Sequence, residues 1–179
     1  MRTEEFNLQP HLVGGLVELR PLSADDWAGL FAVAADPMIW ELHHAHDRYK
    51  EEVFRNYFRD ALASGGALVA LDRSNHKIIG SSRYVWHGPD PSEHEIGWTF
   101  LARSYWGGIY NREMKRLMLD HAFTFVDHVI FMVGKTNFRS RKAMEKIGGV
   151  LTDRREMKTL YGNVVEHVVY QINKPGSFG

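Results

Sequence analysis

Two adjacent glycines, Gly107 and Gly108, stand between a predicted strand and a predicted helix. Glycines at such a junction let backbone N–H groups approach an anion closely, and the N-terminus of the helix adds a favourable dipole. Arg112, Lys115 and Arg116 follow in the first turns of the helix, where cations oppose the helix dipole unless an anion is bound. The spacing indicates phosphate binding, although an ordinary tight turn followed by a solvated basic face has the same pattern.

Three histidines, His43, His44 and His46, lie close together between two predicted helices. Imidazole is a common zinc ligand, so a metal-dependent hydrolase is one interpretation of this segment. The spacing is unfavourable, because neighbouring residues of an extended chain point to opposite sides, and the sequence has no cysteine that adds a ligand. We therefore predict no metal site and assign the histidines to substrate or loop contacts.

The composition limits the class of protein. A chain of 179 residues is long enough for one domain and short for two. Lysine plus arginine equals aspartate plus glutamate at 22 each, so no broad positive field draws the surface to nucleic acid or membrane lipid. No apolar stretch reaches the roughly 20 residues that span a bilayer. Residues 1–15 also lack the basic start and apolar run of a secretory signal. We expect one cytoplasmic domain over 1–179, with peripheral termini at 1–15 and 174–179.

Apolar periodicity and turn residues predict the elements that position these groups. Two amphipathic helices follow a first strand, and a meander of three strands leads to the glycine pair. Beyond it come a helix, a short strand buried on both faces, a second helix and two final strands. This order is typical of an α+β fold with a mixed, mainly antiparallel sheet of about seven strands and about four helices. The predicted strands are 16–20, 67–71, 78–86, 94–101, 129–133, 149–157 and 164–172, and the predicted helices are 23–36, 50–63, 109–126 and 138–147.

Two stretches in register carry a family resemblance. The first is EIGW at 95–98, followed by YWGGIYNRE at 105–113, and the second is TNFRSRKAMEKIGG at 136–149. Both resemble the cofactor motifs of the GCN5-related N-acetyltransferases (GNAT), and most closely the branch that acetylates the N-termini of ribosomal proteins. The order of predicted elements matches over about 16–173, nearly the whole chain. The resemblance implies a GNAT-like sheet and an enzyme that transfers an acetyl group from acetyl-CoA to a primary amine.

The resemblance also implies a cofactor site. In this family the pantetheine arm lies along the strand that here ends at Leu101, and backbone amides of the following turn hold the pyrophosphate. The implied acetyl-CoA contacts are Leu101, Arg103, Trp106, Gly107, Gly108, Ile109, Tyr110, Asn111, Arg112, Asn137 and Ser140. For Asn137 and Ser140 the ordinary roles of helix N-cap and first-turn polar residue stay open.

The sequence departs from the family pattern at two positions. Ile109 stands where the family has the second glycine of its turn. A β-branched residue does not easily adopt positive φ, so we expect a displaced pyrophosphate and weaker binding. Met144 stands where many relatives have the tyrosine that protonates the departing thiolate, so another donor or water must serve.

Amine acetylation needs a base that takes the proton of the attacking amine. Glu95 matches the strand glutamate of the family and is the favoured base, with Glu93 and His94 as neighbouring candidates and His167 as a more distant one. The residues that the resemblance places beside the acceptor pocket are His43, His44 and His46.

Several alternatives stay open on the sequence. The leading one is an N-acetyltransferase acting on a protein N-terminus or on a small-molecule amine. The others are a non-catalytic CoA-binding module and the metal-dependent hydrolase already described. A homodimer is a further expectation, because exposed strand edges and Trp86 or Trp98 can form a contact surface. The identity of the amine acceptor is not encoded in any recognisable motif.

Overall fold

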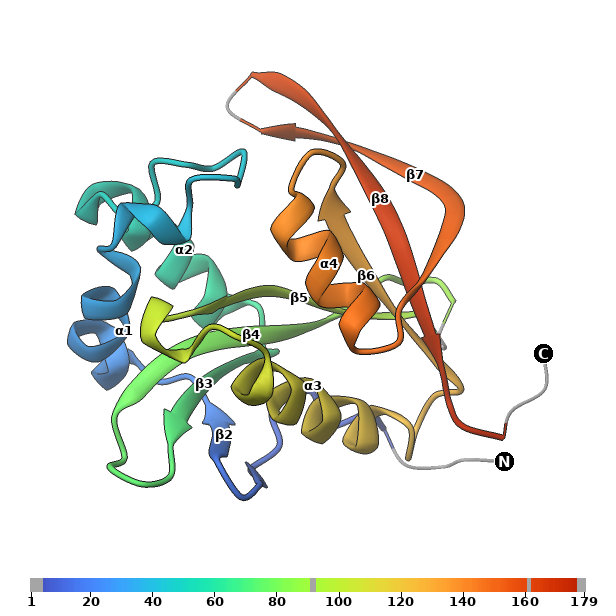
Figure 1. Ribbon diagram of the computed structural model, residues 1–179, viewed down its shortest axis with the longest axis horizontal. Helices are drawn as coiled ribbons and strands as arrows, with labels where there is room; N and C mark the ends of the chain where they lie inside the picture. The colour runs from blue at the N-terminus through green and yellow to red at the C-terminus, as the bar shows by residue number, and fades with distance from the viewer. Residues whose placement is uncertain (1–4, 91–92, 161, 177–179) are drawn as a thin grey trace.

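The computed structural model describes residues 5–90, 93–160 and 162–176, which form one mixed sheet covered by helices (Figure 1). Its eight strands lie in the order β1-β2-β3-β4-β5-β6-β8-β7. The strands are β1 (Leu12–Val13), β2 (Val17–Pro21), β3 (Ala67–Asp72), β4 (Ile78–Trp86), β5 (His94–Leu101), β6 (His128–Gly134), β7 (Val150–Leu160) and β8 (Asn163–Asn173). The α-helices of the described residues are α1 (Trp27–Ala34), α2 (Glu51–Ala63), α3 (Ile109–Ala122) and α4 (Phe138–Lys146).

All neighbouring strands pair antiparallel except β5 and β6, which are parallel. The prediction of an α+β fold on a mixed, mainly antiparallel sheet is therefore confirmed. The sheet has one strand more than predicted, because Leu12 and Val13 pair with Leu19 and Glu18 at its edge. This strand is too short for an alternating pattern to reveal it.

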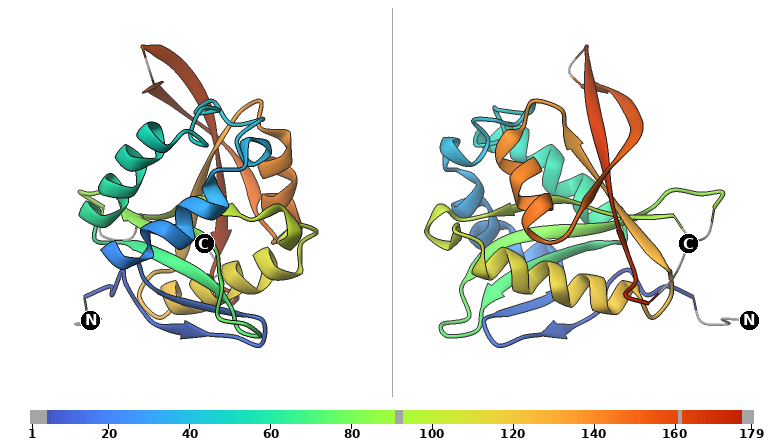
Figure 2. Two further views of the ribbon diagram at one scale, coloured as in Figure 1. Left: turned by 90° about the vertical axis from the view of Figure 1, so that its left-hand side faces the viewer. Right: turned by 45° about the vertical axis from the view of Figure 1, so that its right-hand side comes forward.

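The helices cover both faces of the sheet and define two hydrophobic cores (Figure 2). One core lies under α3 and α4, where Met114, Met118 and Met144 pack against sheet residues such as Tyr84. The other lies under α1 and α2 and includes the aromatic rings of Trp40, Tyr57, Phe54 and Phe100. Polar side chains on one face of β4 and β5 therefore point towards α3 and α4, and those on the other face point towards α1 and α2.

The middle of β5 carries a bulge. Ser81 pairs with Phe100 but Arg83 pairs with Gly97, so two residues of β5, Trp98 and Thr99, lie opposite Ser82 alone. Trp98 has a φ of 52°, which is rare for a residue other than glycine. Beyond the bulge the strands β5 and β6 separate, since their described pairing is limited to Glu95 and Ile130. The separation leaves room beside the end of β5.

Glu113 ties the N-terminal strands to α3. Its carboxylate accepts hydrogen bonds from the backbone N–H groups of Gly15, Leu16 and Val17, at 3.0, 2.7 and 2.7 Å. We expect Glu113→Ala to lower the free energy of unfolding by about 2 kcal/mol, because three donors lose a charged acceptor. Urea unfolding measures the change, with Glu145→Ala on the exposed face of α4 as the control. Equal stability of the two variants would contradict this role for Glu113.

Candidate active site

A cavity of about 370 Å³ lies between the end of β5 and the helices α3 and α4. It contains most of the predicted cofactor residues. Those that line it are Leu101, Trp106, Gly107, Gly108, Asn111, Arg112, Asn137 and Ser140. Two segments that are far apart in the sequence, 101–112 and 137–147, therefore meet at one site, as the two motifs predicted.

The other three predicted cofactor side chains lie outside the cavity lining. Arg103 forms an ion pair with Asp36, Ile109 is 59% exposed, and the ring of Tyr110 packs edge-on against Tyr105. The backbone of Ile109 and Tyr110 can still bind a ligand. The intrahelical hydrogen bonds of α3 begin with Arg112 N–H, which donates to the Gly108 carbonyl at 2.8 Å. The N–H groups of residues 109–111 precede this bond and are left for a ligand.

The turn before α3 uses its two glycines for conformations that other residues rarely adopt. Gly107 has a φ of 110° and Gly108 a φ of 109°, and a Cβ atom built on either meets no atom within 4 Å. Ile109, in contrast, is the first residue of α3 and does not have positive φ. The positive φ angles of this turn thus fall at Gly107 and Gly108, so the conformation on which the expected displacement of the pyrophosphate depended is not required of Ile109.

Asn137 caps a helix at the edge of the cavity. It is the N-cap of α4, where its Oδ1 accepts a hydrogen bond from Ser140 N–H at 3.2 Å, and it also lines the cavity. Next to it, the Arg139 guanidinium lies over the Trp106 ring at 4.3 Å and donates to the Ile39 carbonyl at 2.9 Å. These contacts join α4 to the residue before the glycine turn and to the segment between α1 and α2.

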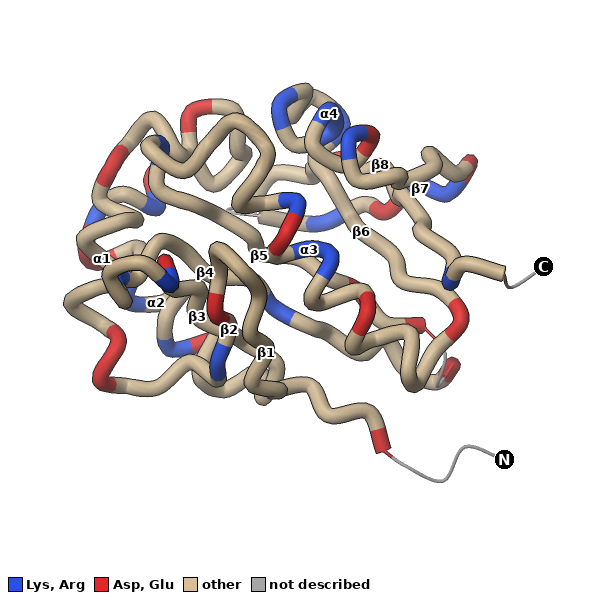
Figure 3. The backbone as a smooth tube through the Cα atoms, turned by 60° about the horizontal axis from the view of Figure 1, so that its bottom comes forward, with Lys and Arg blue, Asp and Glu red and all other residues tan. Residues whose placement is uncertain are grey.

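Positive charge dominates the cavity. Among the described residues that line it there are five lysines and arginines and no carboxylate, and Figure 3 shows basic residues along α4 and near the start of α3. Such a surface binds an anion with several charges. The lining cations are Arg112, Lys115, Arg139, Lys142 and Lys146.

Lys115, which the sequence pattern grouped with Arg112 and Arg116, is buried in the structure. Its side chain is 1% exposed, and Nζ donates hydrogen bonds to Ser82 Oγ at 3.3 Å and to Thr99 Oγ1. Burial lowers the pKa of the Lys115 ammonium to about 7. The prediction of a solvated basic face holds for Arg112 and Arg116, which are both exposed, and Arg116 pairs with Asp120. Helical spacing could have indicated this burial, because Lys115 is three positions before the buried Met118 and so lies on the same face of α3.

The three predicted catalytic residues, Glu93 just before β5 and His94 and Glu95 at its start, do not form one site. Glu95 is 2% exposed and its Oε2 lies 2.6 Å from His87 Nε2, and this hydrogen bond raises the pKa of His87. Glu93 forms an ion pair with Arg154 at 2.7 Å. His94 points to the opposite face, where its ring stacks on Phe6 at 4.3 Å. Strand alternation therefore separates His94 from Glu95, and neither lines the cavity.

The predicted substrate histidines also divide. His43 lines the cavity, whereas the His44 ring packs edge-on against His167 at 5.1 Å and His46 is exposed. Burial, followed by the charge of Arg48, lowers the pKa of His43 to about 2. Burial, followed by the charges of His167 and Arg48, lowers the pKa of His44 to about 4. Both rings are therefore neutral at physiological pH.

Comparison with known proteins shows the family of the chain. The chain matches the family model of the acetyltransferase (GNAT) domain over residues 17–150. It therefore belongs to the GNAT acetyltransferase family, and the resemblance in the motifs is confirmed. As a member of this family the protein is an enzyme that transfers acetyl groups. No curated protein sequence matches the chain.

Solved structures share the fold. A GCN5-related N-acetyltransferase from Brucella melitensis is 17% identical, with a TM-score of 0.78 over 92% of this chain and 79% of its own. An acetyltransferase of the GNAT family from Bacillus anthracis is 16% identical, with a TM-score of 0.74 over 92% and 98%. Ribosomal-protein-S5-alanine acetyltransferase from Vibrio fischeri is 18% identical, with a TM-score of 0.62 over 94% and 98%. Within the described part of the chain, no helix is long and apolar enough to cross a membrane.

Proposed function

We propose that this enzyme transfers the acetyl group of acetyl-CoA to a primary amine by direct attack of the amine on the thioester. The observation that carries the proposal is the cavity lined by cations beside the Gly107-Gly108 turn. Free N–H groups at the start of α3, together with Arg112 and Lys142, fit the phosphates of CoA. We retain the cytoplasmic location and the homodimer as predictions from the sequence.

The end of β5 fits the pantetheine arm. Where β5 and β6 separate, Thr99, Phe100 and Leu101 line the cavity and pair with no described residue of β6. The Leu101 carbonyl accepts a hydrogen bond from Trp106 Nε1 at 2.9 Å, and an amide-containing arm along this edge would pair with the remaining backbone groups as a neighbouring strand does. Bound acetyl-CoA supplies a thioester carbonyl, which a neutral amine attacks.

Glu95 is the proposed base for the attacking amine. One carboxylate oxygen contacts His87, and the other lies over Gly97, since a Cβ atom at Gly97 would be 2.8 Å from Oε1. That oxygen is directed along β5 towards the bulge. We propose that it takes the amine proton directly or through one water, because the carboxylate itself is outside the cavity lining.

Lys115 is the proposed proton donor. Met144 cannot protonate the departing thiolate, but Lys115 lines the same cavity, and its ammonium is hydrogen-bonded to Thr99, which also lines it. An ammonium with a pKa near 7 transfers a proton favourably to a thiolate, whose conjugate acid has a pKa of about 8.5. As the C–N bond forms and the C–S bond breaks, Glu95 gains the amine proton and Lys115 gives one to sulfur.

We expect Glu95→Gln to lower kcat by about 100-fold, because glutamine keeps the shape of the side chain but removes the base. Initial rates with a panel of amines measure the effect, and calorimetry should show unchanged CoA binding. Glu93→Gln is the matched control, since its carboxylate is held by Arg154 and should be dispensable. Full activity of Glu95→Gln would transfer the role of base to another residue.

A further inference from the structure

A group of cations stacked on aromatic rings adjoins the cavity, and we name it the acceptor patch. It consists of Arg48, Tyr57, Arg83, Trp98 and Lys158, from the segment before α2, α2 itself, β4, β5 and β7. The Arg83 guanidinium carbon is 4.8 Å from the centroid of Trp98 and 5.5 Å from that of Tyr57. Arg48 lies 4.9 Å from Tyr57, and Lys158 Nζ lies 5.5 Å from Trp98.

Arg83 is buried without a carboxylate partner. The residue is 6% exposed, its Nε has no hydrogen-bond partner, and none of the described acidic residues lies within ion-pair distance of it. Two other arginines, Arg20 and Arg154, are paired with Asp26 and Glu93. Burying a guanidinium with an unmet Nε donor and no carboxylate partner is costly, so a bound anion would recover free energy at Arg83.

The acceptor patch adjoins the proposed base and the cavity. Arg83 pairs with Gly97, and Glu95 lies two residues from Gly97, so the side chains of Arg83 and Glu95 project from the same face of the sheet. Thr99, next to Trp98, lines the cavity. Trp40 also lines it and has the Arg48 guanidinium over its ring at 5.6 Å. A ligand on the patch is therefore beside the end of β5 where the thioester is expected.

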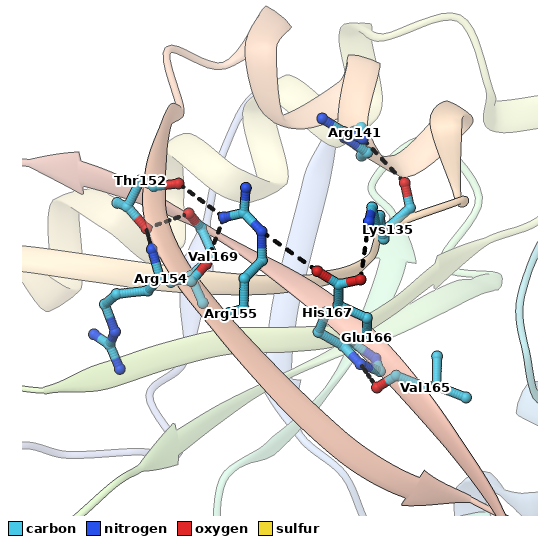
Figure 4. A network of polar contacts seen from close by, with 9 residues as sticks. All are labelled: Lys135, Arg141, Thr152, Arg154, Arg155, Val165, Glu166, His167 and Val169. Carbon is cyan, nitrogen blue, oxygen red and sulfur yellow. Dashed lines mark hydrogen bonds and ion pairs between the residues drawn. The ribbon is translucent and has the colours of Figure 1, made fainter.

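The hairpin of β7 and β8 carries Lys158 of the acceptor patch, and polar side-chain contacts hold the hairpin in place. Glu166 on β8 accepts a hydrogen bond from Lys135 Nζ at 2.9 Å and pairs with Arg155 of β7 at 3.6 Å (Figure 4). Lys158 lies three residues beyond Arg155 on β7. The third cation of the patch is thus positioned by the fold before any ligand binds.

We propose that the acceptor is a free α-amino acid, whose carboxylate binds Arg83 while its amine faces Glu95. This inference rests on the proposed function and narrows its substrate class. Arg83 and Glu95 lie on the same face of the sheet. The cation of Arg83 matches the carboxylate of an amino acid, and the base Glu95 matches the adjacent amine. A peptide N-terminus fits less well, because its first carbonyl is an uncharged amide and leaves the Arg83 charge unmet.

The test compares amino acids with their carboxamides as acceptors at saturating acetyl-CoA. We expect kcat/KM to be about 100-fold higher for the amino acid of each pair, since only it carries the anion for a buried cation. Arg83→Met should abolish this preference while CoA binding, measured by calorimetry, stays unchanged and shows that the variant is folded. Lys158→Met, at the more exposed rim, should reduce the preference by about 10-fold. Arg59→Met, exposed on α2, is the matched control and should keep the preference.

The outcomes separate this inference from the function on which it rests. Equal acetylation of amino acids, amides and peptide N-termini, or an unchanged preference in Arg83→Met, would overturn the acceptor assignment while amine acetylation stands. If no amine in the panel is acetylated, the proposed function fails and this inference fails with it.

Discussion

Replacing Lys115 with methionine is expected to stabilise the fold at pH 7 and to slow acetyl transfer. Methionine retains the buried stem, and Ser82 Oγ and Thr99 Oγ1 still hydrogen-bond each other at 2.8 Å. What disappears is an ammonium whose burial lowers its pKa from 10.5 to about 7. Removing this cost should raise the free energy of unfolding at pH 7 on the order of 2–4 kcal/mol.

The sign of the pH dependence follows from the same shift. Because the folded-state pKa of Lys115 lies below the unfolded-state value, the unfolded chain binds more protons between about pH 7 and pH 10.5. The wild type should therefore gain stability across that window, and its difference from Lys115→Met should shrink as pH rises. Urea unfolding at several pH values measures the difference, and Arg116→Met on the exposed side of α3 should show no comparable change.

The rate of acetyl transfer by the Lys115→Met variant shows whether Lys115 donates a proton or has only a structural role. Loss of the donor should lower kcat by about 100-fold and leave the KM for acetyl-CoA nearly unchanged. The wild-type rate should also decrease above a pKa near 7, and the variant should lose that limb of the profile. A variant that is less stable at pH 7, or as fast as the wild type, would contradict the role assigned to Lys115.

Replacing Gly108 with valine is expected to weaken CoA binding by about 100-fold. At a φ of 109° a β-branched residue is strongly disfavoured, so the turn must change shape and withdraw the N–H groups that precede α3. Calorimetric titration with CoA measures the loss. Gly65→Val is the control, because Gly65 also has positive φ and open space around it but follows α2, outside the cavity lining. Unchanged affinity in Gly108→Val would remove the turn from the phosphate site.

Much of the fold was predictable from local patterns. The limits predicted for β4 and β5 match the structure, because alternating apolar residues and polar turns bound both strands. The limits of α4 also match within one residue, since Asn137 caps its start and Gly148 follows its end. The bulge at Trp98 was not predictable, because it depends on pairing with β4 rather than on the sequence of β5 itself.

The site residues that belong to a sequence motif were predictable. Those whose role depends on burial in the folded protein were not. The glycine turn and Asn137 line the cavity as the motifs implied. Lys115 and Arg83 belong to no motif, and their importance comes from burial without a carboxylate partner, which appears only when helices and strands are assembled. The opposite orientations of His94 and Glu95 were predictable, because neighbouring residues of a strand project from opposite faces of the sheet.

The most direct test of the proposed function measures release of the CoA thiol from acetyl-CoA in the presence of a panel of amines, with mass spectrometry of the products. We expect release that depends on the amine and matches the amount of acetylated product. The wild type should bind CoA, and Glu95→Gln should bind it equally while releasing little thiol. Binding of CoA without release in the presence of any amine would contradict the account and indicate a non-catalytic CoA-binding module.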